Sequence, residues 1–215
     1  MATGRQFVKR SHQFLLIFLL GCSTPQPEQL PSDLVISEKE PSRWTALVKQ
    51  NLIHLAQVHH LEPFLYTRRI RVVPDEVSHS KPVLTINTRF AERPPQLLAI
   101  LLHEQLHWWV DKNARNYRRA SDELKKIYPS VPVYRNNRES TYVHLVVCYL
   151  EFRALWYYLG EPEARRILTE IMNKDKLYPW VYSQVLSKTG HLKKIIERNA
   201  LVPAVLKTNE EPAAL

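Results

Sequence analysis

Apolar residues recur at helical spacing along much of the chain. Between residues 42 and 60 they return every three or four positions, and Ser42 stands where a helix N-cap is expected. The same spacing predicts further helices over residues 95–112, 115–127, 139–159, 163–173 and 191–196. The 95–112 helix is apolar over most of its circumference, so we expect it to be buried. Gly160, followed by a proline, should end the 139–159 helix.

Two short segments have the composition of β-strands instead. Residues 69–73 and 82–87 are rich in β-branched side chains, and Pro82 is compatible with the first position of a strand. The pattern as a whole predicts an α+β fold that is mostly helical. In this fold a small β-sheet packs on the 95–112 helix, and the 139–159 helix lies close by.

The N-terminus has the pattern of a bacterial lipoprotein signal peptide. Basic residues in the first ten positions precede a seven-residue apolar run at 14–20, which is too short to span a bilayer. The run leads into Gly21 and Cys22, so cleavage after Gly21 would leave Cys22 to be lipid-modified. Leu20 departs from the smaller residue usual at that position. An ordinary secretory signal or an uncleaved anchor therefore stays open as an alternative.

This interpretation sets the expected domain organisation and location. Residues 1–21 are the signal peptide, the proline-rich segment 22–40 is a flexible tether, 41–200 form the folded domain and 201–215 form a frayed tail. The protein is expected in the bacterial cell envelope, lipid-anchored to a membrane through Cys22 and facing the periplasm or the exterior.

Composition narrows the class of protein. Hydrophobic residues make up 45% of the 215 residues, enough for a proper core, and the formal net charge is +9. The signal peptide carries three of the positive charges, so the remainder keeps +6. A solvated basic face is the first explanation, and an anionic surface or partner is the second. No nucleic-acid motif is present, and no nucleic-acid partner is expected. Of the two cysteines, Cys148 lies in an apolar helix and is expected to be an inert buried thiol.

The most informative motif is the pentapeptide His-Glu-Gln-Leu-His at residues 103–107. Positions four apart lie on one face of a helix, so His103 and His107 can present two imidazole nitrogens to one metal ion. Glu104 lies beside them, in position to take a proton from a metal-bound water. The alternative is a pair of histidines satisfied by hydrogen bonds in the core. A buried helix makes that alternative costly, which favours a metal.

The pentapeptide, on a helix that follows a strand, resembles the zincin superfamily of zinc metallopeptidases. The resemblance covers the motif and the strand-then-helix order, within about residues 83–151, and not one close family. It implies a zincin-like domain in which His103 and His107 bind Zn²⁺ and Glu104 is the general base. It also implies that an extended substrate aligns along the 83–87 strand. Metzincins are excluded, because Val110 and Asn113 occupy the positions of their Gly and third His.

A third ligand must then come from elsewhere, as in gluzincins, where a later helix supplies it. On the 139–159 helix, His144, Cys148 and Glu151 share one stripe. His144 and Glu151 lie about 10 Å apart along the axis, so both cannot easily bind one zinc ion. We favour His144, with Glu151 as the alternative; the other residue would orient a ligating histidine or contact substrate.

Residues outside the motif are less well determined. His79, His191, Tyr142, Tyr178 and Tyr182 are all candidates to stabilise an oxyanion, and their spacing selects none of them. Aromatic residues on the two main helices are expected to pack in the core (Trp108, Trp109, Trp156, Tyr157, Tyr158).

The favoured function is a zinc-dependent hydrolase, most simply a peptidase with a peptide or protein substrate, in which zinc-bound water reacts with Glu104 as general base. One alternative is a lipid-anchored zincin-like binding protein with structural zinc or none, which four protein ligands around the ion would favour. Another is a metal-dependent amidase acting on a cell-envelope polymer.

Overall fold

The computed structural model describes residues 33–134, 136–174 and 178–207. The predicted signal peptide, Cys22, most of the predicted tether and residues 208–215 lie outside this part. Along the described chain the elements are β1 (Val35–Glu38), α1 (Arg43–Val58), the short 3-10 helix η1 (Glu62–Phe64), β2 (Arg69–Val73), β3 (Leu84–Asn87), the 3-10 helix η2 (Thr88–Phe90), α2 (Pro94–Lys112), α3 (Ala114–Ile127), α4 (Arg138–Leu159), α5 (Glu161–Lys174), α6 (Pro179–Ser187), α7 (Thr189–Arg198) and α8 (Ala204–Lys207). The α+β, mostly helical class is confirmed.

The strands form one small parallel sheet in the order β1-β2-β3. Ile36 of β1 pairs with Ile70 of β2, and Ile70 pairs with Leu84 of β3. The sequence did not predict β1, which falls within the segment expected as a tether. The folded part therefore begins before residue 41. Four residues with alternating exposure carry too weak a pattern to be recognised next to a proline-rich segment.

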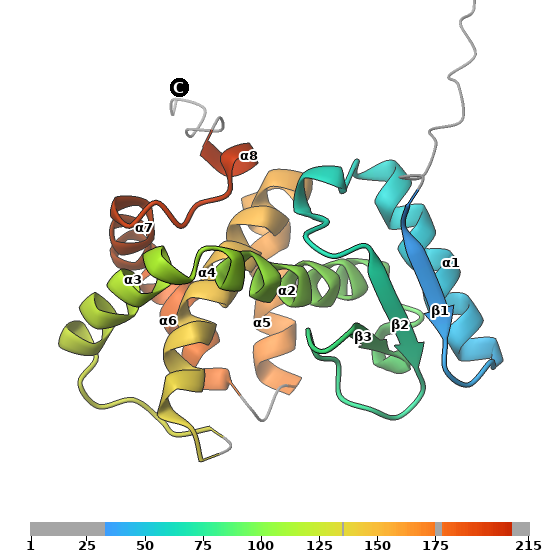
Figure 1. Cartoon of the computed structure of the whole chain (residues 1–215), viewed down its shortest axis with the longest axis horizontal. Helices are drawn as coiled ribbons and strands as arrows, with labels where there is room; N and C mark the ends of the chain where they lie inside the picture. Colours follow the sequence, from blue (N-terminus) through green and yellow to red (C-terminus); the bar gives the residue numbers. More distant parts are fainter. Residues whose placement is uncertain (1–32, 135, 175–177, 208–215) are drawn as a thin grey trace, which may run out of the picture.

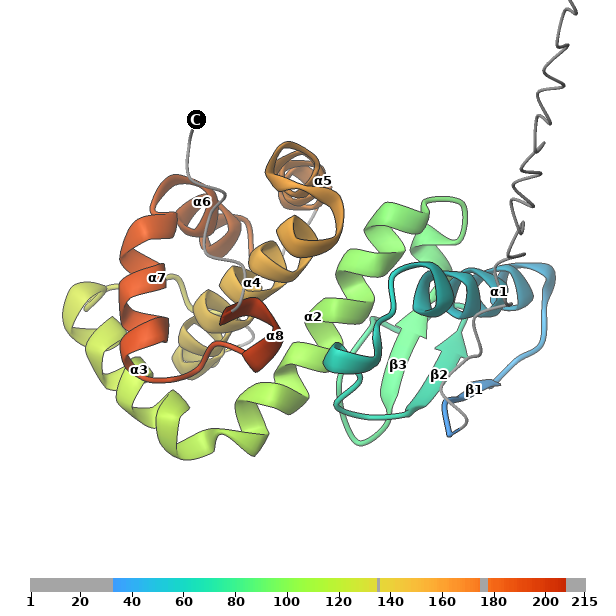
Figure 2. The ribbon, with the colours of Figure 1, turned by 90° about the horizontal axis from the view of Figure 1, so that it is seen from above.

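The helix α2 lies between two parts of the molecule: the β-sheet with α1 on one side, and the helices around α4 on the other (Figures 1 and 2). On one side it packs against β3, α1 and the short segments near them, and on the other it packs mainly against α4. It is buried nearly all round, as its apolar circumference predicts. Its central turns, which carry the pentapeptide, therefore lie at the junction of the sheet with the helical part.

The free side of β3 is partly covered by the chain that precedes it. His79 exchanges two backbone hydrogen bonds with Thr85, with N···O distances of 3.0 and 2.8 Å, and the Ser78 hydroxyl accepts from the Asn87 amide. The 83–87 strand, which the resemblance implies as a substrate edge, is therefore occupied at this point by residues 78 and 79. Any extended ligand on this side meets the 77–80 segment first.

The C-terminal part differs from its prediction in two ways. The aromatic segment around Trp180 forms the helix α6, which the sequence did not predict; Pro179 begins this helix, a position where proline is well tolerated. Residues 201–207, expected to be frayed, pack against the core: Leu201 is fully buried, and its carbonyl accepts from the Trp109 indole at 2.6 Å. Gly160 ends α4 with φ +81°, a conformation that favours glycine. Among the described helices, none is both long and apolar enough to cross a lipid bilayer.

Candidate metal centre

Three histidines from two helices meet at the junction of α2 and α4. His103 and His107 come from α2 and His144 comes from α4. Their ring centroids are 4.9–5.5 Å apart, and one nitrogen from each lies within 4.8 Å of the others. Small side-chain movements would bring all three nitrogens to the ~2.1 Å bonding distance of one ion. The described chain thus contains a donor group that can hold a metal.

Glu151 lies on the far side of His103. Its carboxylate is 2.8 Å from Nδ1 of His103 and is fully buried. A carboxylate accepts hydrogen bonds only, so neutral His103 keeps its proton on Nδ1 and presents Nε2 as the free donor atom. The Tyr182 hydroxyl, from α6, donates to the same carboxylate oxygen at 3.4 Å. Glu151 therefore supports His103 from behind rather than completing the three-histidine group.

His144 is held in an equivalent way. Its Nδ1 donates to the Ser140 carbonyl one turn earlier, at 2.6 Å, which places the proton of the neutral ring on Nδ1 and makes Nε2 the unprotonated nitrogen. The Tyr178 ring stacks on the His144 ring, with centroids 3.7 Å apart and planes 16° from parallel. The Tyr178 hydroxyl in turn is bonded to the Ser140 hydroxyl at 2.9 Å. Hydrogen bonding to Ser140 and the stacked Tyr178 ring thus help to fix the orientation of the His144 ring.

The environment shifts the pKa values of two of these imidazoles, those of His103 and His107, in opposite directions. Burial lowers the pKa of His103, but the Glu151 carboxylate and hydrogen bonds with Cys148 and Glu151 raise it, and the net pKa is well above the ordinary value. Burial, together with the charges that His103 and His144 can carry, holds the pKa of His107 well below its ordinary value. His107 is therefore neutral at neutral pH, the form that ligates metals.

Glu104 lies beside the histidines in an open cleft of about 400 Å³. The side chains of His103, His107 and His144 line the same cleft, so all of the predicted site residues except Glu151 meet in one space. Glu104 itself is 6% exposed. A carboxylate next to a three-nitrogen donor group, open to solvent on one side, is an arrangement suited to acid–base chemistry on a small molecule bound at that side.

A second possible donor group shares His103 and adds Cys148 and Glu151. It lies in the buried interior between α2 and α4 rather than in the cleft, because Cys148 and Glu151 are both fully buried. Burial raises the pKa of the Cys148 thiol to about 11, which keeps it protonated at neutral pH. A protonated thiol is a poor ligand, so the three-histidine group is the better metal site.

The structure separates the five candidates for oxyanion stabilisation. His79, Tyr178 and Tyr182 line the cleft. Tyr142 instead points its hydroxyl at the Tyr128 carbonyl, at 2.7 Å, and His191 lies exposed on α7. The sequence had no means of making this choice, because it depends on where α6 and the 77–80 segment pack.

Two supporting contacts escaped the sequence analysis entirely. One is the contact of Tyr178, just before α6, with His144 and of Tyr182, on the first turn of α6, with Glu151; the sequence offered both tyrosines only as oxyanion candidates. The other is Gln105, inside the pentapeptide, which is fully buried and bonded to both backbone groups of Thr67. The apolar neighbours of Gln105 on the helix were a usable signal of this contact, since they predict that its amide is buried and a buried amide needs hydrogen-bond partners.

Comparison with known proteins yields no match: no family model, no curated protein and no solved structure resembles the chain closely enough to assign it. The function is therefore inferred from the residues of the site themselves.

Proposed function

We propose that the protein is a zinc-dependent hydrolase, most simply a peptidase, of zincin-like type. The observation that carries the proposal is the meeting of His103, His107 and His144 beside Glu104 in an open cleft. Three imidazole nitrogens with a neighbouring carboxylate are a donor set found in catalytic zinc sites. Bound there, zinc would polarise a carbonyl and lower the pKa of water, which is the chemistry such an ion supplies.

Each residue of the candidate metal centre then has a defined role. His103, His107 and His144 would hold the ion, His103 and His144 through Nε2 and His107 through one of its ring nitrogens. Glu104 accepts the proton of the attacking water and returns it to the leaving group. Glu151 orients His103 and increases its basicity.

The position of Glu151 favours a catalytic zinc site over a closed structural one. Glu151 contacts Nδ1 of His103 and is grouped with His103 and Cys148 rather than with His107 and His144, so it does not supply a fourth ligand to the three-histidine group. Structural zinc sites have four protein ligands, and catalytic sites keep one position open. The open side of the donor group faces the cleft.

The test is Glu104→Gln, which removes the base and keeps the shape. We expect bound zinc to be unchanged and kcat to fall by about 10²–10⁴-fold on a fluorogenic peptide library. Glu92→Gln, an exposed carboxylate before α2, is the matched control and should be fully active.

Full activity of the Glu104→Gln variant would exclude this mechanism. If the wild-type chain binds zinc but hydrolyses neither peptides nor amide polymers of the cell envelope, the binding-protein alternative takes its place.

A further inference from the structure

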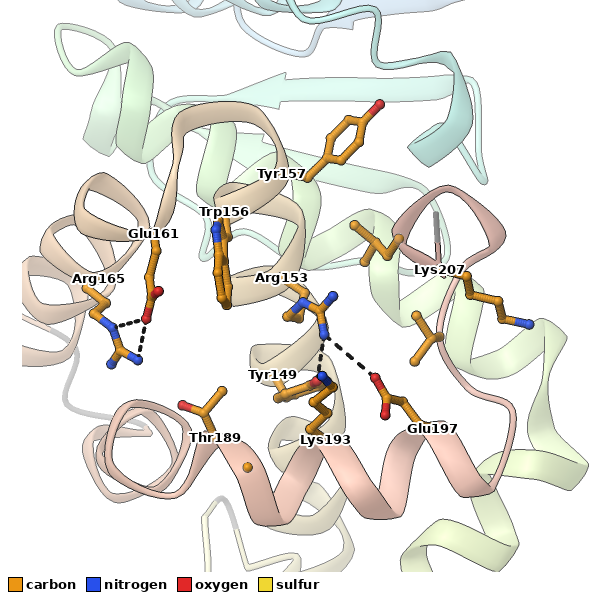
Figure 3. A pocket seen from close by; sticks show the side chains of 13 residues that line it. Tyr149, Arg153, Trp156, Tyr157, Glu161, Arg165, Thr189, Lys193, Glu197 and Lys207 are labelled. Carbon is orange, nitrogen blue, oxygen red and sulfur yellow. Dashed lines mark hydrogen bonds and ion pairs between the residues drawn. The ribbon is translucent and has the colours of Figure 1, made fainter. Parts of the chain in front are cut away.

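A second cavity lies on the opposite face of α4 from the metal-binding group. Its volume is about 800 Å³, twice that of the cleft, and α4, α7 and the chain around α8 form its walls (Figure 3). Arg153, which lines it, is nine residues after His144, and nine residues correspond to half a turn beyond two full turns of a helix. The cavity is therefore separate from the candidate catalytic site.

The floor of this cavity is cationic. The Arg153 side chain is 13% exposed; its guanidinium donates to the Tyr149 hydroxyl at 3.1 Å and lies 3.8 Å from the Glu197 carboxylate. That ion pair is long, and Glu197 is 43% exposed, so it compensates the charge only weakly. A guanidinium has five N–H donors, and the two contacts leave several of them for a ligand.

Further positive charge stands at the rim. Lys193 of α7 and Lys207 at the end of α8 line the cavity, and within the described chain neither makes an ion pair or a side-chain hydrogen bond. The remaining cation, Arg165, is already held by Glu161 at 2.7 Å, as the dashed lines of Figure 3 show. The charge left without a close partner in the described cavity is therefore positive.

The other walls are apolar. Trp156 lies beside the guanidinium of Arg153, whose central carbon is 5.7 Å from the ring centroid, and Val202 and Leu206 face the same space. Trp156, expected in the core from the sequence, thus contributes to a cavity wall. A cavity of this volume with an apolar wall and a few converging polar groups has the size and composition of a small-molecule site.

We propose that this cavity binds an organic anion: a phosphate or carboxylate group attached to an apolar body. Arg153 and Lys193 contact the anionic group, because they offer charge-assisted donors from neighbouring helices. Trp156 and Leu206 contact the apolar body. The ligand is an amphipathic molecule, either a lipid with an anionic headgroup or a soluble organic anion.

The experiment measures binding to the full chain by calorimetry, with three probes below their micellar concentrations. They are decyl phosphate, which carries both features, inorganic phosphate, which lacks the apolar body, and decyl maltoside, which lacks the charge. We expect decyl phosphate to bind at least ten times more tightly than either of the others. Competition by dihexanoyl phosphatidylglycerol assigns the anion to a lipid headgroup, and its failure to compete assigns it to a soluble molecule.

A matched pair of variants locates the site. Lys193→Gln should weaken binding of decyl phosphate about 5- to 10-fold, whereas Lys194→Gln, an equal loss of charge at the next, exposed position of α7, should change it less than 2-fold. Equal effects of the two variants, or equal affinity for inorganic and decyl phosphate, would overturn the proposal, because both results indicate general attraction to a basic surface. Zinc content, measured in parallel, should not change in either variant.

Discussion

At the scale of single residues, His103 connects the two parts of the candidate metal centre. One of its nitrogens contacts the buried Glu151 carboxylate, and the other is left for the group that faces the cleft. The raised pKa of His103 follows from that carboxylate, against the opposing effect of burial. A carboxylate behind a ligating histidine fixes the ring and strengthens the ligand.

This arrangement predicts different consequences for the two candidate third ligands. His144→Ala removes a donor atom and should abolish stoichiometric zinc binding. Glu151→Gln keeps the shape and one hydrogen-bond acceptor, so zinc affinity should fall by about 10- to 100-fold without loss of the site. Competition with a fluorescent zinc chelator measures both values, and circular dichroism verifies the fold. Zinc retained in the His144 variant and lost in the Glu151 variant would reverse the two roles.

The sequence could predict that His144 and Glu151 share one face of a helix, but periodicity alone could not tell which of them lies in the metal-binding group. His144 and Glu151 lie on one face of α4, two turns apart, and periodicity treats them alike. Which of them faces His107 depends on where α2 crosses α4, and that crossing follows from side-chain packing of both helices. The pentapeptide, in contrast, needed only the local geometry of one helix.

At the scale of elements, α2 is attached to the sheet side of the molecule by a side chain in the middle of its motif. The Gln105 amide donates to the Thr67 carbonyl at 2.8 Å and accepts from the Thr67 amide at 2.9 Å. These two bonds join α2 to the segment that leads into β2. They fix the height of the motif relative to the sheet.

Removing this connection should destabilise the protein. Gln105→Ala leaves both backbone groups of Thr67 without their partner and opens a small cavity, at a cost of about 2–3 kcal/mol in the free energy of unfolding. Gln50→Ala, at an exposed position of α1, is the control and should change it by less than about 0.5 kcal/mol. Denaturant unfolding gives both numbers. Similar values for the two variants would show that the connection contributes little.

The long helices were predictable because each has a sustained apolar periodicity, and their ends lie within a few residues of the expected positions. β1 and α6 were not. β1 is four residues long and is stabilised by pairing with β2, a segment more than thirty residues away. α6 begins at a proline in an aromatic cluster, where neither the period nor the composition distinguishes a helix from a loop.

At the scale of the whole molecule, the donor group joins parts of the chain that are distant in sequence. His103 and His107 belong to the helix that packs on the sheet, whereas His144 belongs to the helical part. A metal bound to all three would therefore stabilise the folded state over the unfolded one, because the unfolded chain does not hold the donors together.

Metal removal tests this coupling. At free zinc 100 to 1,000 times the Kd, binding should add about 2.7–4.1 kcal/mol of stability. Chelation should then lower the Tm by roughly 5–15 °C for a chain of this size. The His144→Ala variant, examined by the same thermal scan, should show little response to the chelator. A wild-type Tm that is independent of zinc would contradict a site shared between the two parts.

The donor histidines are divided between α2 and α4, and the irregular segment between α3 and α4 separates these two groups in the sequence. Cutting the chain there leaves His103, Glu104 and His107 on one fragment and His144 with Glu151 on the other. Neither fragment has the full donor set, yet α2 on one and α4 on the other make the largest helix–helix contact in the described part of the chain. Recovery of metal binding on mixing would thus report reassembly of a split protein, with the ion itself as the signal.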